Sequence, residues 1–369
     1  MSKIGIMGGT FNPIHNGHIK IAQAAKSEYH LDKVIFLTSG NPPHKRDEAI
    51  LDAKIRHIMV KRAISEIDGF EPCDYEVNRT EYSYSVNTLR HFKETMPDDE
   101  LFFIIGGDSL RDFHKWYQPD EILKLCTLLV YDRKDGKFES DFAKPIRGDM
   151  LDISSTGIRQ KLEKGEDVSL LIPSAVLDFI NKYYLYRKKL GQMEQLKSLL
   201  TPERYAHSIG VMESSVELAE IYGADTEKAK IAGLLHDCAK NLDDLYEHCK
   251  SLEVELDEVE LKSPPLVHAK LGAEIAKIHF GITDPEILEA IRWHTIGKPG
   301  MSLLEKIVFV ADLTEPGRTY PDAAPLRELS RTNLDEALCK CVDATIKINQ
   351  KRGNFVHPNA YLILEEINL

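Results

Sequence analysis

The chain has no long hydrophobic run. None of its apolar stretches reaches the roughly 20 residues of a membrane-spanning helix. The first apolar segment, Met1–Met7, leads directly into glycines and lacks the pattern of a signal peptide. We therefore expect a cytoplasmic protein with no membrane partner.

Cysteine is scarce. The six cysteines of the 369 residues are Cys73, Cys126, Cys238, Cys249, Cys339 and Cys341. They form no CxxC pair of the zinc-binding kind and no disulfide framework of a small secreted domain. A reducing compartment, with most cysteines as small core residues, is the expected setting.

Positive charge is in deficit. There are 47 Lys and Arg against 59 Asp and Glu, so the formal net charge is -12. This balance argues against nucleic acid or an anionic membrane as a partner. A small phosphorylated molecule remains compatible with it, because a few local cations or a metal suffice to bind one.

The first half of the chain alternates short apolar runs with stretches of helical spacing. This rhythm predicts βα units and a mostly parallel sheet in a domain over residues 1–186. Expected strands are Lys3–Met7, Val34–Leu37, Leu101–Ile105 and Thr127–Tyr131; expected helices are Gly17–Tyr29, Asp52–Ile67, Ser85–Glu94, Ser155–Glu163 and Ser174–Tyr184.

From about residue 192 the strand pattern disappears. Apolar residues follow helical spacing, and Pro or Gly marks the segment ends, which predicts an all-α domain over residues 194–369. A basic stretch that ends in glycine suggests a linker over 187–193. The expected helices are Pro202–Tyr222, Thr226–His236, Pro264–Phe280, Pro285–His294, Leu303–Leu313 and Leu334–Gln350.

Two histidines follow the first predicted strand in the string GGTFNPIHNGH, residues 8–18. Glycines at a strand–helix turn let backbone amides approach a ligand, and a helix N-terminus favours negative charge. His15 and His18, three residues apart, can face one ligand and stabilise charge on a transferring phosphoryl group. A polar turn with solvated histidines is the alternative.

The whole string resembles the HxGH signature of the nucleotidyltransferase superfamily, and most closely that of nicotinate mononucleotide adenylyltransferases. Further strings in the same order support the resemblance: NPPHK at 41–45, YSYSVNTL at 82–89, GGDS at 106–109, WY at 116–117 and ISSTGIR at 153–159. One departure is Asn12, where many relatives have Asp. Both residues suit a turn, so little consequence is expected.

This resemblance implies a Rossmann-like domain that transfers AMP from ATP, carried with Mg²⁺, to nicotinate mononucleotide and releases pyrophosphate. The implied catalytic residues are His15, His18, Lys45 and Arg159; the nucleotide-binding residues are Gly8, Gly9, Thr10, Phe11, Asp108, Ser154, Ser155 and Thr156; the nicotinate-binding residues are Ser85, Trp116 and Tyr117. Taken singly, Trp116 would be a core or rim aromatic, Asp108 a helix cap and Lys45 a solvated cation.

A second histidine set lies beside apolar runs of the helical half. Its members are His207, His236, Asp237, His268, His294 and Asp312. A buried imidazole or carboxylate needs a partner, and one metal can satisfy several at once. A helical domain with satisfied histidines and no metal is the alternative.

The order of this set resembles the HD-domain metallophosphohydrolases. The strings RYAHSIGV at 204–211, HDCAK at 236–240, WHTIG at 293–297 and ADLTEPGR at 311–318 are similar to bacterial enzymes that split diadenosine tetraphosphate into two ADP. The resemblance implies two divalent ions, with Fe or Mn favoured by the mixed ligands.

The resemblance to this family also implies the ligands of each ion: His207, His236, Asp237 and Asp312 hold one ion, and His268 and His294 help to hold a second. Arg204, Lys240 and Arg318 would neutralise the polyphosphate of a dinucleoside polyphosphate substrate. A regulatory nucleotide-binding module, or hydrolysis of another phosphorylated nucleotide, is the alternative for this half. Nicotinate against nicotinamide preference, coupling between the halves and association into a homo-oligomer stay open.

Overall fold

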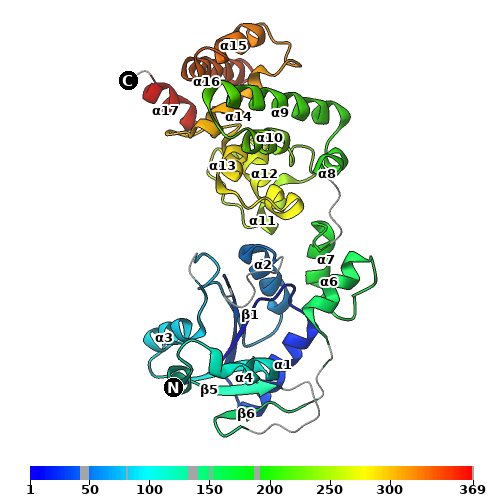
Figure 1. Cartoon of the computed structure of the whole chain (residues 1–369), viewed down its shortest axis with the longest axis vertical. Helices are drawn as coiled ribbons and strands as arrows, with labels where there is room; N and C mark the ends of the chain where they lie inside the picture. The colour runs from blue at the N-terminus through cyan, green and yellow to red at the C-terminus, as the bar shows by residue number, and fades with distance from the viewer. Residues whose placement is uncertain are drawn as a thin grey trace. The chain divides into compact units, whose positions relative to one another are not determined.

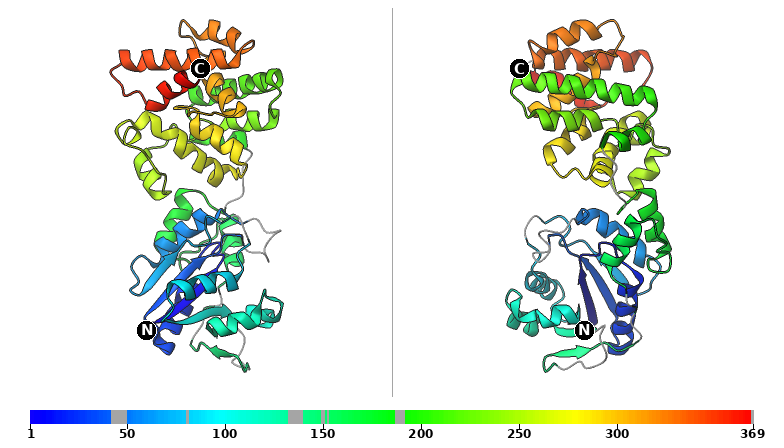
Figure 2. Two further views of the ribbon diagram at one scale, coloured as in Figure 1. Left: turned by 90° about the vertical axis from the view of Figure 1, so that its left-hand side faces the viewer. Right: turned by 45° about the vertical axis from the view of Figure 1, so that its right-hand side comes forward.

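The computed structural model describes residues 1–41, 50–79, 82–131, 140–148, 151, 153–186 and 192–367. The chain divides into two compact units, Met1–Lys188 and Lys189–Leu369. The first contains a sheet with helices and the second is helical (Figures 1 and 2). This confirms the predicted fold class, an α/β Rossmann-like domain followed by an all-α domain.

All strand pairs of the first unit are parallel. The strands are β1 (Lys3–Gly9), β2 (Lys33–Thr38), β3 (Phe70–Cys73), β4 (Glu100–Gly106), β5 (Thr127–Tyr131) and β6 (Ala143–Pro145), in the spatial order β3-β2-β1-β4-β5-β6. The order reverses between β1 and β4. In open parallel sheets a ligand crevice lies at such a point, outside the carboxyl ends of the strands.

The helices of this unit include every helix predicted there. They are α1 (Asn16–Tyr29), α2 (Ala53–Ile64), α3 (Ser85–Thr95), α4 (Gly107–Arg111), α5 (Pro119–Leu125), α6 (Ser155–Glu163) and α7 (Ser174–Lys182), with a 3₁₀ turn at Phe113–Lys115. The short β3, β6, α4 and α5 were not predicted, because segments of three to seven residues carry too little periodicity to register.

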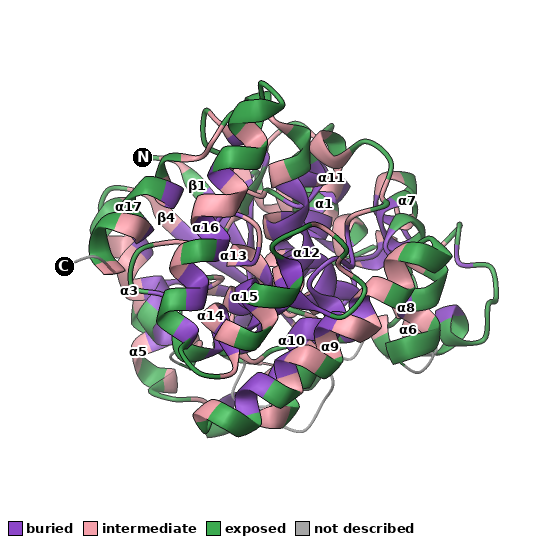
Figure 3. Cartoon of the chain, turned by 90° about the horizontal axis from the view of Figure 1, so that it is seen from above, coloured by how far each residue is buried: buried purple, intermediate pink, exposed green. Residues whose placement is uncertain are grey.

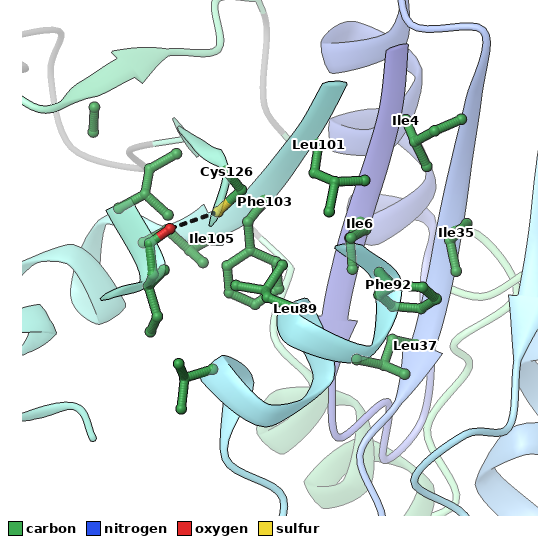
Figure 4. Packing of buried hydrophobic residues seen from close by; sticks show 14 of the residues in the cluster. Ile4, Ile6, Ile35, Leu37, Leu89, Phe92, Leu101, Phe103, Ile105 and Cys126 are labelled. Atoms are coloured by element: carbon green, nitrogen blue, oxygen red, sulfur yellow. Dashed lines mark hydrogen bonds between the residues drawn. The ribbon is translucent and has the colours of Figure 1, made fainter. Parts of the chain in front are cut away.

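One face of the sheet is held by alternating side chains of the central strands. Ile4 and Ile6 of β1, with Leu101 and Phe103 of β4, are buried on the same face, as a period of two requires. Leu89 and Phe92 of α3 pack against them (Figure 4). This packing fixes where the carboxyl ends of β1 and β4 lie.

The second unit is built from ten α-helices within its described residues. They are α8 (Gln192–Leu199), α9 (Pro202–Tyr222), α10 (Thr226–Leu235), α11 (Leu245–Ser251), α12 (Pro264–Phe280), α13 (Pro285–Trp293), α14 (Leu303–Thr314), α15 (Ala323–Ser330), α16 (Leu334–Lys351) and α17 (Pro358–Ile367). The six predicted helices are present, and α8, α11, α15 and α17 are additional.

Two helices form the centre of this unit. α12 and α14 bury most of their residues, which is the pattern of a helix enclosed by others rather than of a surface helix (Figure 3). α9 instead carries many exposed residues along its length. Among the described residues no helix is both long and apolar enough to cross a membrane.

Candidate functional sites of the two units

The turn between β1 and α1 places the two N-terminal histidines together. His15 is the N-cap of α1 and is buried, and its backbone N–H donates to His18 Nδ1 at 3.2 Å. The two imidazole rings stack with their centroids 3.7 Å apart. A Cβ on Gly17 would lie 3.0 Å from the His15 ring, so the glycine lets the ring fold over the helix start.

The N-terminus of α6 packs against this same turn. Ser155 Oγ donates to the Pro13 carbonyl at 2.9 Å, and Arg159 Nη1 donates to the Asn12 carbonyl at 2.9 Å. Ser154 caps α6 by accepting from the Gly157 N–H at 3.1 Å. The structure thus joins the histidine turn to the helix start at 154–156, although about 140 residues separate them in sequence.

A buried arginine organises the backbone beneath the turn. Arg56 of α2 is 1% exposed and donates to the carbonyls of Thr10, Gly40 and Leu51 at 2.6, 3.1 and 2.8 Å. Burial lowers the pKa of its guanidinium to about 10. Sequence reasoning missed Arg56, because α2 also holds Lys54, Lys61 and Arg62 and no pattern in the sequence marks one of these cations as buried.

A second link ties the end of the first unit to the turn. The Tyr186 hydroxyl donates to Asn12 Oδ1 at 2.8 Å. Burial raises the pKa of the Tyr186 phenol well above its usual value, so the hydroxyl stays protonated and acts as the donor. Asn12 is therefore held through its side chain by Tyr186 and through its carbonyl by Arg159.

The residues expected to bind nicotinate belong to, or lie next to, a set of aromatic side chains that we call the aromatic group beside α3. Ser85 is the first residue of α3, and Tyr84 before it lies 5.0 Å from Tyr117, ring centroid to ring centroid. Trp116 is half-buried against Phe113, 5.5 Å away. Tyr117 is 52% exposed, so it can contact a ligand.

The predicted residues Gly8, Gly9, Phe11 and Asp108 lie at the carboxyl ends of β1 and β4 or just after them. Gly8 and Gly9 close β1, and Phe11 is buried with its ring 5.1 Å from His18 in an edge-on contact. Asp108 is exposed in α4 and pairs with Arg111 rather than capping the helix. Lys45 lies outside the described residues.

The second unit brings its six predicted ligands into one cluster. In the first half of it, His207 Nε2 of α9 lies 2.9 Å from Asp312 Oδ1 of α14 and 3.3 Å from His236 Nε2. His236 Nε2 lies 3.5 Å from Asp237 Oδ2. We call His207, His236 and Asp312, with Asp237 Oδ2, half-site 1.

The other oxygen of Asp237 faces a second pair of histidines. Asp237 Oδ1 lies 3.0 Å from His268 Nε2 of α12 and 3.5 Å from His294 Nε2. The two Nε2 atoms are 3.1 Å apart. We call His268 and His294, with Asp237 Oδ1, half-site 2; the buried Asp237 side chain bridges both half-sites.

Each histidine of the cluster is oriented through its other ring nitrogen. His236 Nδ1, His268 Nδ1 and His294 Nδ1 each lie 2.7 Å from the carbonyl of the residue three positions earlier. His207 Nδ1 instead lies 3.0 Å from Glu315 Oε1. All four Nε2 atoms therefore turn toward the cluster, as metal-binding imidazoles held by outer partners do.

Three cations surround the carboxylates of the cluster. Arg204 Nη1 donates to Asp237 Oδ2 at 2.8 Å, and Arg318 Nη2 donates to Asp312 Oδ1 at 2.5 Å. Lys240 Nζ lies 3.1 Å from His268 Nε2. These residues were predicted to contact polyphosphate, and the structure places all three against the ligand cluster.

The charges of the cluster hold its carboxyl groups ionised. Burial alone would raise the pKa of Asp237, but His236, His268 and His294 lower it well below the usual range. Burial opposes ionisation of Asp312 as well, and His207 and His236 lower its pKa in the same way. Burial lowers the pKa of His268 to about 4, which leaves this imidazole neutral and able to bind a metal.

Two residues near the cluster were not assigned from sequence. Thr295 Oγ1 lies 3.1 Å from His268 Nε2 and 3.0 Å from His294 Nε2. Glu315 contacts His207. Both belong to strings that pointed to this site, but a hydroxyl or carboxylate next to a ligand has no distinctive spacing of its own.

Comparison with protein families divides the chain as the two units do. A family described as Cytidylyltransferase-like matches residues 6–161, and the HD domain matches residues 204–317. The HD domain implies a divalent metal. The half-sites fit one, because imidazole nitrogens and carboxylate oxygens converge within 4.8 Å of one another in two sets, His207/His236/Asp312 and His236/Asp237/His294.

Curated relatives cover either half or nearly all of the chain. The "Probable nicotinate-nucleotide adenylyltransferase" of Clostridium tetani is 45% identical over 200 residues, 51% of this chain and 100% of the relative. The "Probable nicotinate-nucleotide adenylyltransferase/Ap4A hydrolase" of Mycoplasma genitalium is 32% identical over 343 residues, 91% of this chain and 95% of the relative.

Solved structures resemble the chain one half at a time. The crystal structure of a predicted HD superfamily hydrolase involved in NAD metabolism from Clostridium acetobutylicum is 40% identical, covers 49% of this chain and 98% of its own, and has a TM-score of 0.47. A nicotinic acid mononucleotide adenylyltransferase of Plasmodium falciparum complexed with NaAD is 23% identical over 50% of this chain and 98% of its own, with a TM-score of 0.44.

Proposed function

We infer the function of this chain from its family: it belongs to the family of fused nicotinate-nucleotide adenylyltransferases and Ap4A hydrolases, which the Mycoplasma genitalium relative represents over 91% of the chain. We propose that residues 1–186 transfer AMP from ATP to nicotinate mononucleotide. We propose that residues 194–369, after a linker at 187–193, hydrolyse diadenosine tetraphosphate to two ADP.

In the first reaction the 5′-phosphate of nicotinate mononucleotide attacks the α-phosphorus of ATP. A P–O bond forms to the incoming phosphate, the bond to the β-phosphate breaks, and pyrophosphate carries away the electron pair. No proton transfer is needed at the reacting oxygens. What the protein must supply is position and positive charge.

We assign this charge to His15, His18, Lys45 and Arg159. The observation that carries the assignment is the packing of α6 on the histidine turn, because it brings Arg159 and the capped helix N-terminus to the same backbone as His15. A helix N-terminus favours phosphate oxygens. ATP arrives with Mg²⁺, and its phosphates would meet Gly8–Phe11 and Ser154–Thr156.

The aromatic group beside α3 is assigned to the acceptor nucleotide. Trp116 and Tyr117 would stack on the pyridine ring, and Ser85 would donate to its carboxylate from the first turn of α3. Asp108 is exposed at the carboxyl end of β4, where a ribose hydroxyl can donate to it. A carboxylate-reading contact of this kind would favour nicotinate over nicotinamide mononucleotide.

In the second reaction water attacks a central phosphorus of the tetraphosphate. The P–O–P bond between the two inner phosphates breaks, and one ADP takes the hydroxyl of water while the other takes its proton. We propose that half-sites 1 and 2 each hold one divalent ion, Fe or Mn. Such ions supply Lewis-acid polarisation of phosphate and lower the pKa of water.

The chain's own residues have separate tasks in this reaction. The metal ligands would be the neutral imidazole of His268 and the ionised carboxylates of Asp237 and Asp312, as such ions require. The cations would turn from these carboxylates to the polyphosphate of the substrate; they are Arg204, Lys240 and Arg318. The bridging of both half-sites by Asp237 carries this proposal. A single carboxylate with each oxygen facing a different histidine set fits two adjacent ions better than one.

Two assays on the purified chain test the proposal. The first follows pyrophosphate release from ATP with nicotinate or nicotinamide mononucleotide as acceptor. The second incubates diadenosine tetraphosphate with Fe²⁺ or Mn²⁺ and separates the products by anion exchange, with the His236→Ala/Asp237→Ala variant as control. ADP as sole product, absent from the control, supports hydrolysis. Metal binding without turnover would redirect the proposal to another phosphorylated nucleotide or to a regulatory module.

A further inference from the structure

One histidine of the ligand cluster differs from the other three in the group that its Nδ1 atom contacts. His236, His268 and His294 each contact a neutral carbonyl three residues earlier. His207 also lies inside a helix, α9, but its Nδ1 faces a partner side chain from another element. That partner is Glu315, which follows α14 and is 4% exposed.

Both oxygens of Glu315 are committed. Oε1 lies 3.0 Å from His207 Nδ1, and Oε2 accepts from the Gly317 N–H at 2.5 Å. Arg318 Nε lies 3.9 Å from Oε1. An ionised carboxylate can only accept, and His207 faces one at each ring nitrogen: Glu315 at Nδ1 and Asp312 Oδ1, 2.9 Å away, at Nε2. A metal ion at half-site 1 would take the lone pair of Nε2, and Glu315 would then accept the proton that stays on Nδ1.

Two glycines leave room for this carboxylate. A Cβ on Gly210, one turn after His207 on α9, would lie 2.6 Å from Glu315 Oε2. A Cβ on Gly317 would lie 2.9 Å from each oxygen of Glu315. Glycine at both positions therefore leaves space for the Glu315 carboxylate. A larger residue at either position would force the carboxylate to move.

We propose that Glu315 is a positioning residue of half-site 1: it fixes the tautomer and orientation of His207 and strengthens His207 as a metal ligand. The negative charge of Glu315 makes the His207 imidazole more basic, and so a stronger metal ligand, than a neutral carbonyl partner would. Loss of an outer partner of this kind typically lowers metal affinity by about 10- to 100-fold. The inference rests on the proposed metal-dependent hydrolase, but it concerns metal affinity and not turnover.

The test is Co²⁺ binding to the metal-free full chain, measured by competition with a chelator and by the visible spectrum of the bound ion. Glu315→Gln has one acceptor oxygen, so it cannot serve both His207 and Gly317. We expect it to weaken Co²⁺ binding about 10- to 100-fold and to alter the spectrum. Glu328→Gln, a charge change on a side chain that is 74% exposed, is the matched control and should bind as the wild type does.

A second variant reaches the carboxylate without changing it. Gly210→Ala is favourable for an α-helix in general, but its Cβ must displace Glu315. We expect a loss of Co²⁺ affinity in the same direction. The thermal unfolding of the metal-free variants separates positioning from a purely structural role, which would lower the unfolding temperature and leave the affinity unchanged.

The outcomes separate this inference from the proposed function. Co²⁺ affinities of Glu315→Gln and Gly210→Ala within twofold of the wild type would overturn the inference, whatever the enzyme hydrolyses. Normal Co²⁺ binding by the wild type without ADP formation would refute hydrolysis of diadenosine tetraphosphate and leave the role of Glu315 intact. A wild-type chain that binds no Co²⁺ would overturn both.

Discussion

A buried histidine outside the ligand cluster makes the stability of the helical unit sensitive to acid. His279 lies near the end of α12 and is 7% exposed. Burial, with a smaller contribution from His248, lowers its pKa from 6.5 to about 4. Because the unfolded chain binds this proton more readily than the folded chain, the stability held at neutral pH is lost as pH falls from the unfolded value toward the folded one.

The two pKa values set the size of the loss. At about 1.4 kcal/mol per unit, protonation of His279 costs about 3 kcal/mol of unfolding free energy below pH 4 and about 2 kcal/mol at pH 5. His279→Gln cannot take up the proton, so its stability should fall less steeply between pH 7 and pH 5. The difference between wild type and variant isolates His279, because His268 titrates in the same way in both.

The assay is urea unfolding of the metal-free chain at both pH values. The chain has two tryptophans, Trp116 in the first unit and Trp293 in the second. A Trp116→Phe background therefore leaves Trp293 as the fluorescent reporter of the helical unit. His30→Gln, at an exposed position of the first unit, is the control. Parallel pH dependences for wild type and His279→Gln would refute the reasoning.

Three further predictions concern the site residues. His18→Ala should lower the rate of adenylyl transfer by about 10²- to 10³-fold, the usual effect of losing one oxyanion donor, while Co²⁺ binding stays normal; an unchanged rate would remove His18 from catalysis. Arg56→Met should lower the unfolding free energy of the first unit by about 3–5 kcal/mol, since three partly buried carbonyls lose their charged donor, as followed by Trp116 fluorescence in a Trp293→Phe background. Tyr186→Phe should cost about 1 kcal/mol by the same assay, and no loss at all would mean that its bond to Asn12 adds nothing.

Much of the first unit could be predicted because each signal was local. The alternation of Ile4 and Ile6 marked a strand, and the glycines and histidines of residues 8–18 marked the turn after it. Nothing local connected that turn to Ser155 and Arg159; only the order of motifs in a resembling family did. The bonds that join them run between backbone carbonyls and distant side chains, which periodicity does not encode.

In the ligand cluster, too, local signals could be predicted from sequence and contacts between distant residues could not. Histidines beside apolar runs predicted buried ligands, and the structure brings all six together. The bridging position of Asp237 depends on how α10, α12 and α14 pack and has no signature in sequence. Glu315 and Arg56 were missed for a related reason: each acts through another residue's geometry, and a single charged residue in a helix or loop is most often solvated.

The shared carboxylate of Asp237 also has a consequence for how the enzyme would respond to its surroundings. If half-sites 1 and 2 each hold an ion, as proposed, the two ions would share Asp237 and would be thermodynamically linked, so that each would change the affinity of the other by the same factor. A reaction that needs both would rise more steeply with free metal than one that needs a single magnesium nucleotide. Under the proposed function, the two halves of the polypeptide would then respond differently to the metal supply: NAD precursor synthesis would continue, while hydrolysis of dinucleoside polyphosphates would slow as the divalent metal of the half-sites becomes scarce.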